Sequence, residues 1–195
     1  MRLIRGFRAV FLLIIITIFL TVFQNASAES PTLEEKAAQN ESDNVEVWCS
    51  KGEAFLKEDK NNEAIEAFNK ALKLNRSYVN AWNGKGKALY NLHRYDESIH
   101  FFEKAIEIDP EFAGAWCNKG NALSRMGDFN GSLLYVDKAI LINPTEALFW
   151  NSKGLVLSEL GRYNESFQCL EKALEINPEL CYAWGNKGLI LGKLG

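Results

Sequence analysis

The sequence contains few residues of the kinds that usually carry out catalysis. Among 195 residues there are only two histidines, His93 and His100. His-x-x-x-His, Cys-x-x-Cys, glycine-rich phosphate loops and Gly-x-Ser-x-Gly do not occur. Metal ligands must converge on one point, and these histidines are far in sequence from most of the four cysteines. The sequence therefore predicts a protein that is not an enzyme, with no catalytic site, cofactor or metal.

A surplus of positive charge is also missing. The formal net charge is -3, with 22 basic and 25 acidic residues interspersed along the chain. Nucleic-acid binding requires a basic surface that neutralises phosphates. We therefore do not expect a nucleic-acid partner.

Long hydrophobic runs are absent apart from residues 9–23. This run follows three arginines and precedes Ala26-Ser27-Ala28, which is the organisation of a secretory signal. We expect residues 1–28 to be a signal peptide cleaved after Ala28. An uncleaved membrane anchor through residues 9–23 is the alternative, although the run is shorter than the roughly 20 residues that span a bilayer. In both cases the remainder would lie outside the cytoplasm, secreted or attached to the outer face of the membrane.

The most informative feature is an internal repeat. Tryptophan recurs every 34 residues, and each tryptophan is followed three and four residues later by Lys-Gly: Trp48, Trp82, Trp116, Trp150 and Trp184. With Val45 as position 1, position 8 is this glycine and position 20 is Ala or Ser. Position 24 is apolar (Phe68, Phe102, Val136 and Leu170), and proline ends three of the four complete repeats.

This pattern resembles the tetratricopeptide repeat, a 34-residue unit with Trp and Gly on one helix and Ala, Phe and Pro on the next. The Ala-Trp-x-x-Lys-Gly form is similar to many archaeal and bacterial members. The resemblance implies an all-α fold, a right-handed α-solenoid of antiparallel helix pairs. We assign residues 29–44 to a polar flexible segment. The repeats are then 45–78, 79–112, 113–146 and 147–180, with the first helix of an incomplete fifth at 181–195.

The repeated side chains have structural explanations. Apolar residues follow helical spacing in two stretches per repeat, which predicts two helices of about 12–14 residues. Isolated helices of about that length are marginal in water, so they need packing partners to be stable. The tryptophans are therefore expected to be buried structural residues. For the five lysines at position 7, we expect the aliphatic stem to cover apolar surface while the ammonium reaches water. An anion-binding ladder of lysines is the alternative.

The resemblance also implies a concave groove lined by the first helix of each repeat, through positions 2, 5, 6, 9, 12 and 13. We expect a protein or peptide segment to bind there. Asparagine, which both donates and accepts hydrogen bonds, is frequent in this set, and its C-terminal part is more apolar. The alternative is an ordinary polar surface. The candidate groove residues are Asn80, Asn83, Lys87, Tyr90, Asn118, Asn121, Arg125, Leu148, Asn151, Leu155, Tyr182, Asn186 and Leu189.

The C-terminal part of the sequence leaves two further functions open. The last helix is apolar where solenoids usually end in a polar helix, so self-association through this open helix, as in an envelope or structural protein, is possible. A truncated accessory domain of a larger enzyme is another alternative.

The cysteines are expected to be free thiols. Cys49 and Cys117 are two repeats apart, and Cys169 and Cys181 are expected at different heights along neighbouring helices, so neither pair should be close enough for a disulfide.

Overall fold

The structure, a computed structural model, describes residues 44–195. The expected signal peptide (1–28), its apolar run (9–23) and the flexible segment (29–44, except Asn44) lie outside the described residues. Within residues 44–195, no helix combines the length and the apolar character needed to cross a membrane.

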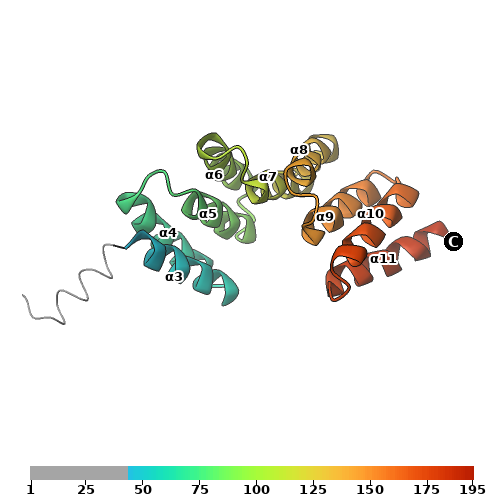
Figure 1. Cartoon of the computed structure of the whole chain (residues 1–195), viewed down its shortest axis with the longest axis horizontal. Helices are drawn as coiled ribbons and strands as arrows, with labels where there is room; N and C mark the ends of the chain where they lie inside the picture. The colour runs from blue at the N-terminus through green and yellow to red at the C-terminus, as the bar shows by residue number, and fades with distance from the viewer. Residues whose placement is uncertain (1–43) are drawn as a thin grey trace, which may run out of the picture. The chain divides into compact units, whose positions relative to one another are not determined.

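The described residues form nine helices and no strand, arranged as four consecutive helix pairs and one further helix (Figure 1). This confirms the predicted all-α solenoid. The helices are α3 (Val45–Lys57), α4 (Asn61–Leu74), α5 (Val79–Asn91), α6 (Tyr95–Ile108), α7 (Ala113–Arg125), α8 (Phe129–Ile142), α9 (Ala147–Glu159), α10 (Tyr163–Ile176) and α11 (Cys181–Leu194).

A left-handed residue ends the first helix of every pair. It stands at position 15 in all four repeats and is glycine in only two of them: Asp59 (φ 57°), His93 (φ 60°), Gly127 (φ 86°) and Gly161 (φ 72°). The next amide then reaches the carbonyl five residues back, as Arg94 N donates to Leu89 O at 2.9 Å. This 6→1 bond stops the first helix and turns the chain toward the second.

The loop between successive pairs is held by two recurring hydrogen bonds. The side chain at position 31 accepts from the backbone amide two residues later, which closes an Asx turn: Asn75, Asp109, Asn143 and Asn177. The indole N–H of the next repeat's tryptophan then donates to the carbonyl at position 32, as Trp116 does to Pro110 O at 2.8 Å. The prediction of buried tryptophans was wrong in degree. The indoles of Trp82, Trp116 and Trp150 reach these loops at the surface and are partly buried. Trp184 makes the same hydrogen bond and is 54% exposed.

Glycine at position 8 and the large apolar residue at position 24 form the core of each pair. The Phe68 side chain is fully buried against Gly52 of its own repeat and Gly84 of the next. The same contact joins Gly86 to Phe102, Gly120 to Val136, and Gly154 to Leu170. Because glycine has no Cβ, the two helices of a pair can approach closely.

The first helices contact one another along the array. Each of α3, α5, α7 and α9 contacts the next first helix, whereas no second helix contacts another second helix in the described part of the chain. The first helices therefore form a continuous inner face, and the second helices lie outside it (Figure 1). This inner face carries the predicted groove positions.

Candidate functional site

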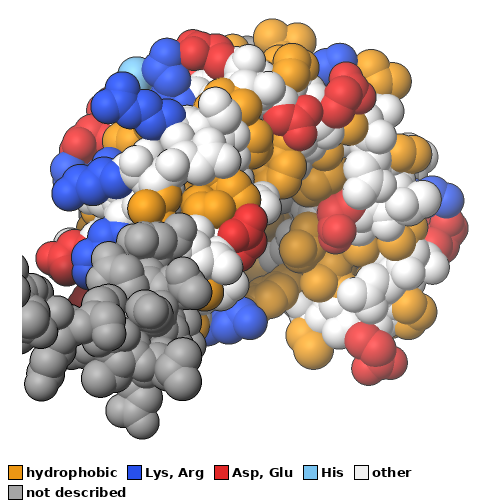
Figure 2. Space-filling view, turned by 60° about the vertical axis from the view of Figure 1, so that its left-hand side comes forward, with side chains coloured by type: hydrophobic (Ala, Val, Ile, Leu, Met, Phe, Trp, Pro, Cys, Tyr) orange, Lys and Arg blue, Asp and Glu red, His pale blue; other side chains and the backbone are white. Residues whose placement is uncertain are grey.

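The inner face of the first helices contains open pockets. One, of about 510 Å³, lies between α3 and α5 and includes Asn80 and Asn83 in its lining. A second, of about 470 Å³, lies between α5, α7 and α9 and is lined in part by Tyr90, Asn121, Arg125 and Leu155. The space-filling view shows a hollow in the described residues with hydrophobic side chains on its walls (Figure 2).

A smaller pocket, of about 190 Å³, brings together four of the predicted residues: Lys87, Tyr90, Asn118 and Asn121. Further along the array, Leu155, Asn186 and Leu189 line one narrow cavity. Leu148 and Tyr182 are exposed near the N-terminal ends of α9 and α11. The structure thus places most of the predicted residues on the inner face, around four neighbouring pockets.

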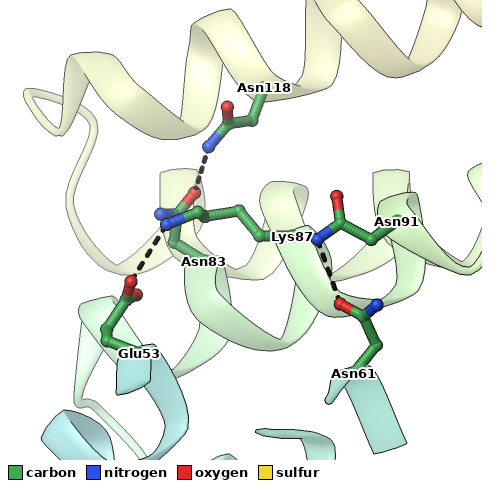
Figure 3. Close-up of polar contacts among 6 residues, drawn as sticks. All are labelled: Glu53, Asn61, Asn83, Lys87, Asn91 and Asn118. Carbon is green, nitrogen blue, oxygen red and sulfur yellow. Dashed lines mark hydrogen bonds and ion pairs between the residues drawn. The ribbon is translucent and has the colours of Figure 1, made fainter. Parts of the chain in front are cut away.

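Several of the predicted asparagines hydrogen-bond to one another between neighbouring first helices. Asn118 Nδ2 donates to Asn83 Oδ1 at 2.9 Å (Figure 3), and Asn186 Nδ2 donates to Asn151 Oδ1 at 2.8 Å. Asn83 and Asn151 are buried. In each of these two contacts, the asparagine at position 6 of one repeat pairs with the asparagine at position 5 of the repeat before it. These two buried asparagines therefore join the helices and leave little of their amides for a ligand.

Between these two asparagine contacts lies a third contact, which is formed by different side chains. The Cys117 thiol, at position 5, is 3.6 Å from the Ser152 hydroxyl, at position 6, and donates to it. We call the three contacts the inner rungs: Asn83–Asn118, Cys117–Ser152 and Asn151–Asn186.

Charged side chains add two contacts on the same face. Lys87 Nζ lies 3.1 Å from Glu53 Oε2 (Figure 3), and Arg125 Nε donates to Tyr90 Oη at 3.0 Å. The hydrogen bond from Arg125 to Tyr90 raises the pKa of that guanidinium above its ordinary value. Sequence reasoning named Lys87 but missed Glu53, although Glu53 stands at the same position 9 one repeat earlier.

At the C-terminal end of α5, another polar contact was also missed. Asn91 Nδ2 donates to Asn61 Oδ1 at 3.0 Å, which joins α5 to the start of α4 (Figure 3). Asn91 stands at position 13, one of the predicted groove positions, so the position rule could have identified it.

The inner face changes from polar to apolar along the chain. Position 9 is Glu53, Lys87 and Asn121 in the first three repeats, and then Leu155 and Leu189. Position 2 changes in the same way, and it ends with Leu148 and Tyr182. These four apolar side chains are 42%, 71%, 49% and 75% exposed in the order named. We call them the apolar patch.

Of the five lysines at position 7, Lys51 is exposed as expected, but the other four bind acceptors in the preceding repeat. Each of the last four pairs with position 25 of the preceding repeat: Lys85 with Asn69, Lys119 with Glu103, Lys153 with Asp137 and Lys187 with Glu171. Lys119 is buried, and its ammonium lies 4.0 Å from the centroid of the Tyr135 ring. The earlier interpretation was wrong because the side chain crosses the boundary between two repeats, where an acceptor stands.

The ionisation of these lysines depends on the partner. Burial lowers the pKa of Lys119, but its hydrogen bonds to Glu103 and Tyr135 outweigh that effect and raise the pKa above its ordinary value. Lys85, whose partner Asn69 is neutral, has a pKa lowered mainly by burial. Both lysines serve to join repeats, which leaves no row of free ammonium groups to bind anions.

The cysteines are free, as expected, and three of the four are buried. Burial raises the pKa values of Cys49 and Cys117 to about 11, so both remain thiols at neutral pH. Among the described residues, no three side chains of histidine, cysteine, aspartate or glutamate are grouped to hold a metal ion.

Comparison with protein families agrees with the repeat pattern. Tetratricopeptide-repeat family models match residues 79–112 and 147–180, and further repeat models of the same kind match residues 52–93 and 101–133. Together these matches cover more than half of the sequence. The chain belongs to the tetratricopeptide-repeat family.

Solved structures show the same fold. A structure of MamA is 22% identical with a TM-score of 0.60, over 75% of this chain and 80% of that one. YrrB, described as a tetratricopeptide-repeat protein with an unusual peptide-binding site, is 20% identical with a TM-score of 0.59, over 84% of each chain. The first repeat domain of Spaghetti (RPAP3), bound to the HSP90 peptide SRMEEVD, is 22% identical with a TM-score of 0.56, over 60% of this chain and 92% of that one. A comparison with the curated proteins gives no significant match.

Proposed function

We propose that this chain is a non-catalytic scaffold that binds a segment of another polypeptide along its inner face. The observation that carries this proposal is the set of open pockets on that face, lined by both polar and apolar side chains. Concave sites of mixed character are the usual places for ligands. Support also comes from two structural neighbours, one described by its peptide-binding site and one bound to a peptide.

A capture experiment tests the proposal. The purified protein is used as bait against the envelope fraction of its source cells, beside an inner-face variant, Tyr90→Ser with Asn121→Glu. Serine and glutamate already stand at these positions in other repeats, as Ser124 and Glu53, so the variant should fold. The control is Leu141→Glu, on the outside of α8, where Glu107 stands one repeat earlier. We expect one partner to be recovered by the parent and the control but not by the inner-face variant. Equal recovery by all three would contradict the proposal.

We further propose that the scaffold works outside the cytoplasm. The support is the arrangement of the N-terminal sequence, with basic residues, an apolar run and Ala26-Ser27-Ala28 in order. N-terminal sequencing of the protein from its source cells tests this. A mature chain beginning at Glu29 would support export with cleavage, whereas an intact Met1 in a membrane fraction would support the anchor. An intact Met1 in the cytoplasmic fraction would contradict both.

Self-association through α11 is a second candidate. In α11, Trp184 and Leu191 are exposed and a Cβ at Gly188 would meet nothing within 4 Å. The equivalent Leu157 and Gly154 of α9 are buried. Sedimentation over a range of protein concentrations tests this candidate. Association that disappears in Leu191→Gln would support it, and a monomer at every concentration would exclude it.

A further inference from the structure

The apolar patch has a spacing that suits a helix. Leu148 and Leu155 are seven residues apart on α9, and Tyr182 and Leu189 are seven residues apart on α11. Seven residues of helix rise about 10.5 Å. A ligand helix lying along these two helices would repeat its own side chains at the same interval, with an apolar stripe at i, i+3, i+4 and i+7 to contact both rows.

Most polar side chains between the two rows are already paired. The narrow cavity there is lined by Ser158, Ser166 and Asn186 among apolar residues and glycine. Asn186 donates to the buried Asn151, and the Ser166 hydroxyl donates to the Gly154 carbonyl oxygen. An extended peptide needs partners for its backbone amides and carbonyls when it is removed from water. A helix satisfies its backbone internally. This part of the inner face is therefore better suited to a helix than to an extended strand.

The charge around the apolar patch is mainly negative. Residues 143–152 and 177–186 contain Glu146 and Glu179 and no lysine or arginine. At the other ends of α9 and α11 stand Glu159 and Lys193. Arg125 lines the same pocket as Leu155 and Glu159, whereas Lys153 and Lys187 are paired with Asp137 and Glu171. Three carboxylates therefore stand against two cationic side chains, and this excess of negative charge favours a basic ligand.

The exposure of the two leucines on α9 does not depend on α11 being uncovered. Leu148 and Leu155 remain 49% and 42% exposed although α11 packs beside α9. The equivalent residues of the second repeat, Asn80 and Lys87, are exposed and partly exposed on the same inner face. Exposure of the side chains at positions 2 and 9 is therefore a property of the inner face, and the apolar residues there are particular to the last repeats.

We propose that the apolar patch binds a basic amphipathic helix of the partner protein, laid along α9 and α11. This inference rests on the proposed scaffold function and specifies which kind of segment of the partner protein the scaffold binds. The polar first half of the inner face would contact the part of the partner that flanks this helix.

Two displayed peptide libraries test the inference on the whole protein. One presents helices of about 18 residues in an alanine, lysine and glutamine host, randomised at the stripe positions, a length at which such helices form in water. The other presents peptides of the same length with two fixed prolines, which prevent a continuous helix. Binders are measured against the parent and against Leu155→Asn and Leu189→Lys. Asparagine and lysine already occupy position 9 in other repeats, as Asn121 and Lys87. Leu141→Glu, which removes a 75% exposed leucine from α8, is the control.

We expect binders from the helical library, with affinities that fall about tenfold or more in each inner-face variant and stay unchanged in the control, because a buried leucine contributes at least this factor. A proline placed in the middle of such a binder should abolish binding. Binders obtained only from the proline library, or binders lost in Tyr90→Ser but not in Leu155→Asn, would overturn the helix and leave the scaffold function standing. No specific binder from either library would overturn both.

Discussion

Replacing Gly154 with alanine would test the close packing of α9 on α10. A Cβ at this position would lie 2.9 Å from Cγ and 3.1 Å from Cδ2 of Leu170, whose side chain is fully buried. It would also lie 3.2 Å from the backbone oxygen of Ser166. Since that oxygen belongs to the α10 backbone, rotation of a side chain is not enough, and the two helices would have to separate.

The size of the effect follows from two opposing contributions. Adding a methyl group to a well-packed core costs about 1–3 kcal/mol. Alanine in place of glycine within a helix stabilises by about 1 kcal/mol. We therefore expect Gly154→Ala to lose about 1 kcal/mol, and at most about 2. Gly188 occupies the same position in α11, where a Cβ would meet nothing within 4 Å. Gly188→Ala should keep only the favourable contribution, so the two substitutions should have opposite signs.

Urea unfolding followed by far-ultraviolet circular dichroism measures both variants against the parent. The expected result is a lower midpoint for Gly154→Ala and an equal or higher one for Gly188→Ala, with similar slopes. If Gly154→Ala proved as stable as Gly188→Ala, the close approach of α9 and α10 would be incorrect, and with it the explanation of glycine at position 8.

Four further substitutions test other features of the packing, each by thermal or urea unfolding. Trp116→Phe should lower stability by at least about 1 kcal/mol, because it removes the indole hydrogen bond to the preceding loop and part of the ring that stacks on Tyr135. Ser132→Ala should be neutral or stabilising, since that buried hydroxyl has no hydrogen-bond partner, whereas Ser166→Ala should lose about 1 kcal/mol with its bond to a backbone oxygen. Asn69→Glu should raise the pKa of Lys85 and stabilise by less than about 1 kcal/mol after solvent screening. This gain should be present at neutral pH and be lost in strong alkali as the pH passes the raised pKa of Lys85, and high salt should reduce it.

The repeat itself could be predicted because its signals are local and recur. Glycine at position 8 and an apolar residue at position 24 indicate where two helices meet, and the structure brings Gly86 to Phe102 as this pattern requires. The positions of the inner face were expected from the resemblance to the tetratricopeptide family, and most of the candidate residues lie there. What such a pattern does not give is the direction and partner of each polar side chain.

The lysines at position 7 show why. Considered within one repeat, Lys119 has no acceptor, and its ammonium was expected in water. Its partner Glu103 lies 16 residues earlier, in the preceding repeat. A comparison of residues 16 apart would have found an acidic or amide side chain each time. The rung between Asn83 and Asn118 was missed for the same reason, because its two residues belong to different repeats.

The inner rungs have a consequence for how such an array can change its length. Position 5 alternates between cysteine and asparagine (Cys49, Asn83, Cys117, Asn151), so the chemistry of the rungs repeats every second unit. Loss of residues 79–146 by recombination within the gene would set Cys49 opposite Ser152, which reproduces the existing Cys117–Ser152 contact. Loss of residues 113–146 alone would set Asn83 opposite the serine and create a combination that the protein does not contain. The loss of any one of the repeats 79–112, 113–146 or 147–180 therefore creates a new combination, whereas the loss of two adjacent ones among them keeps the present types of partner.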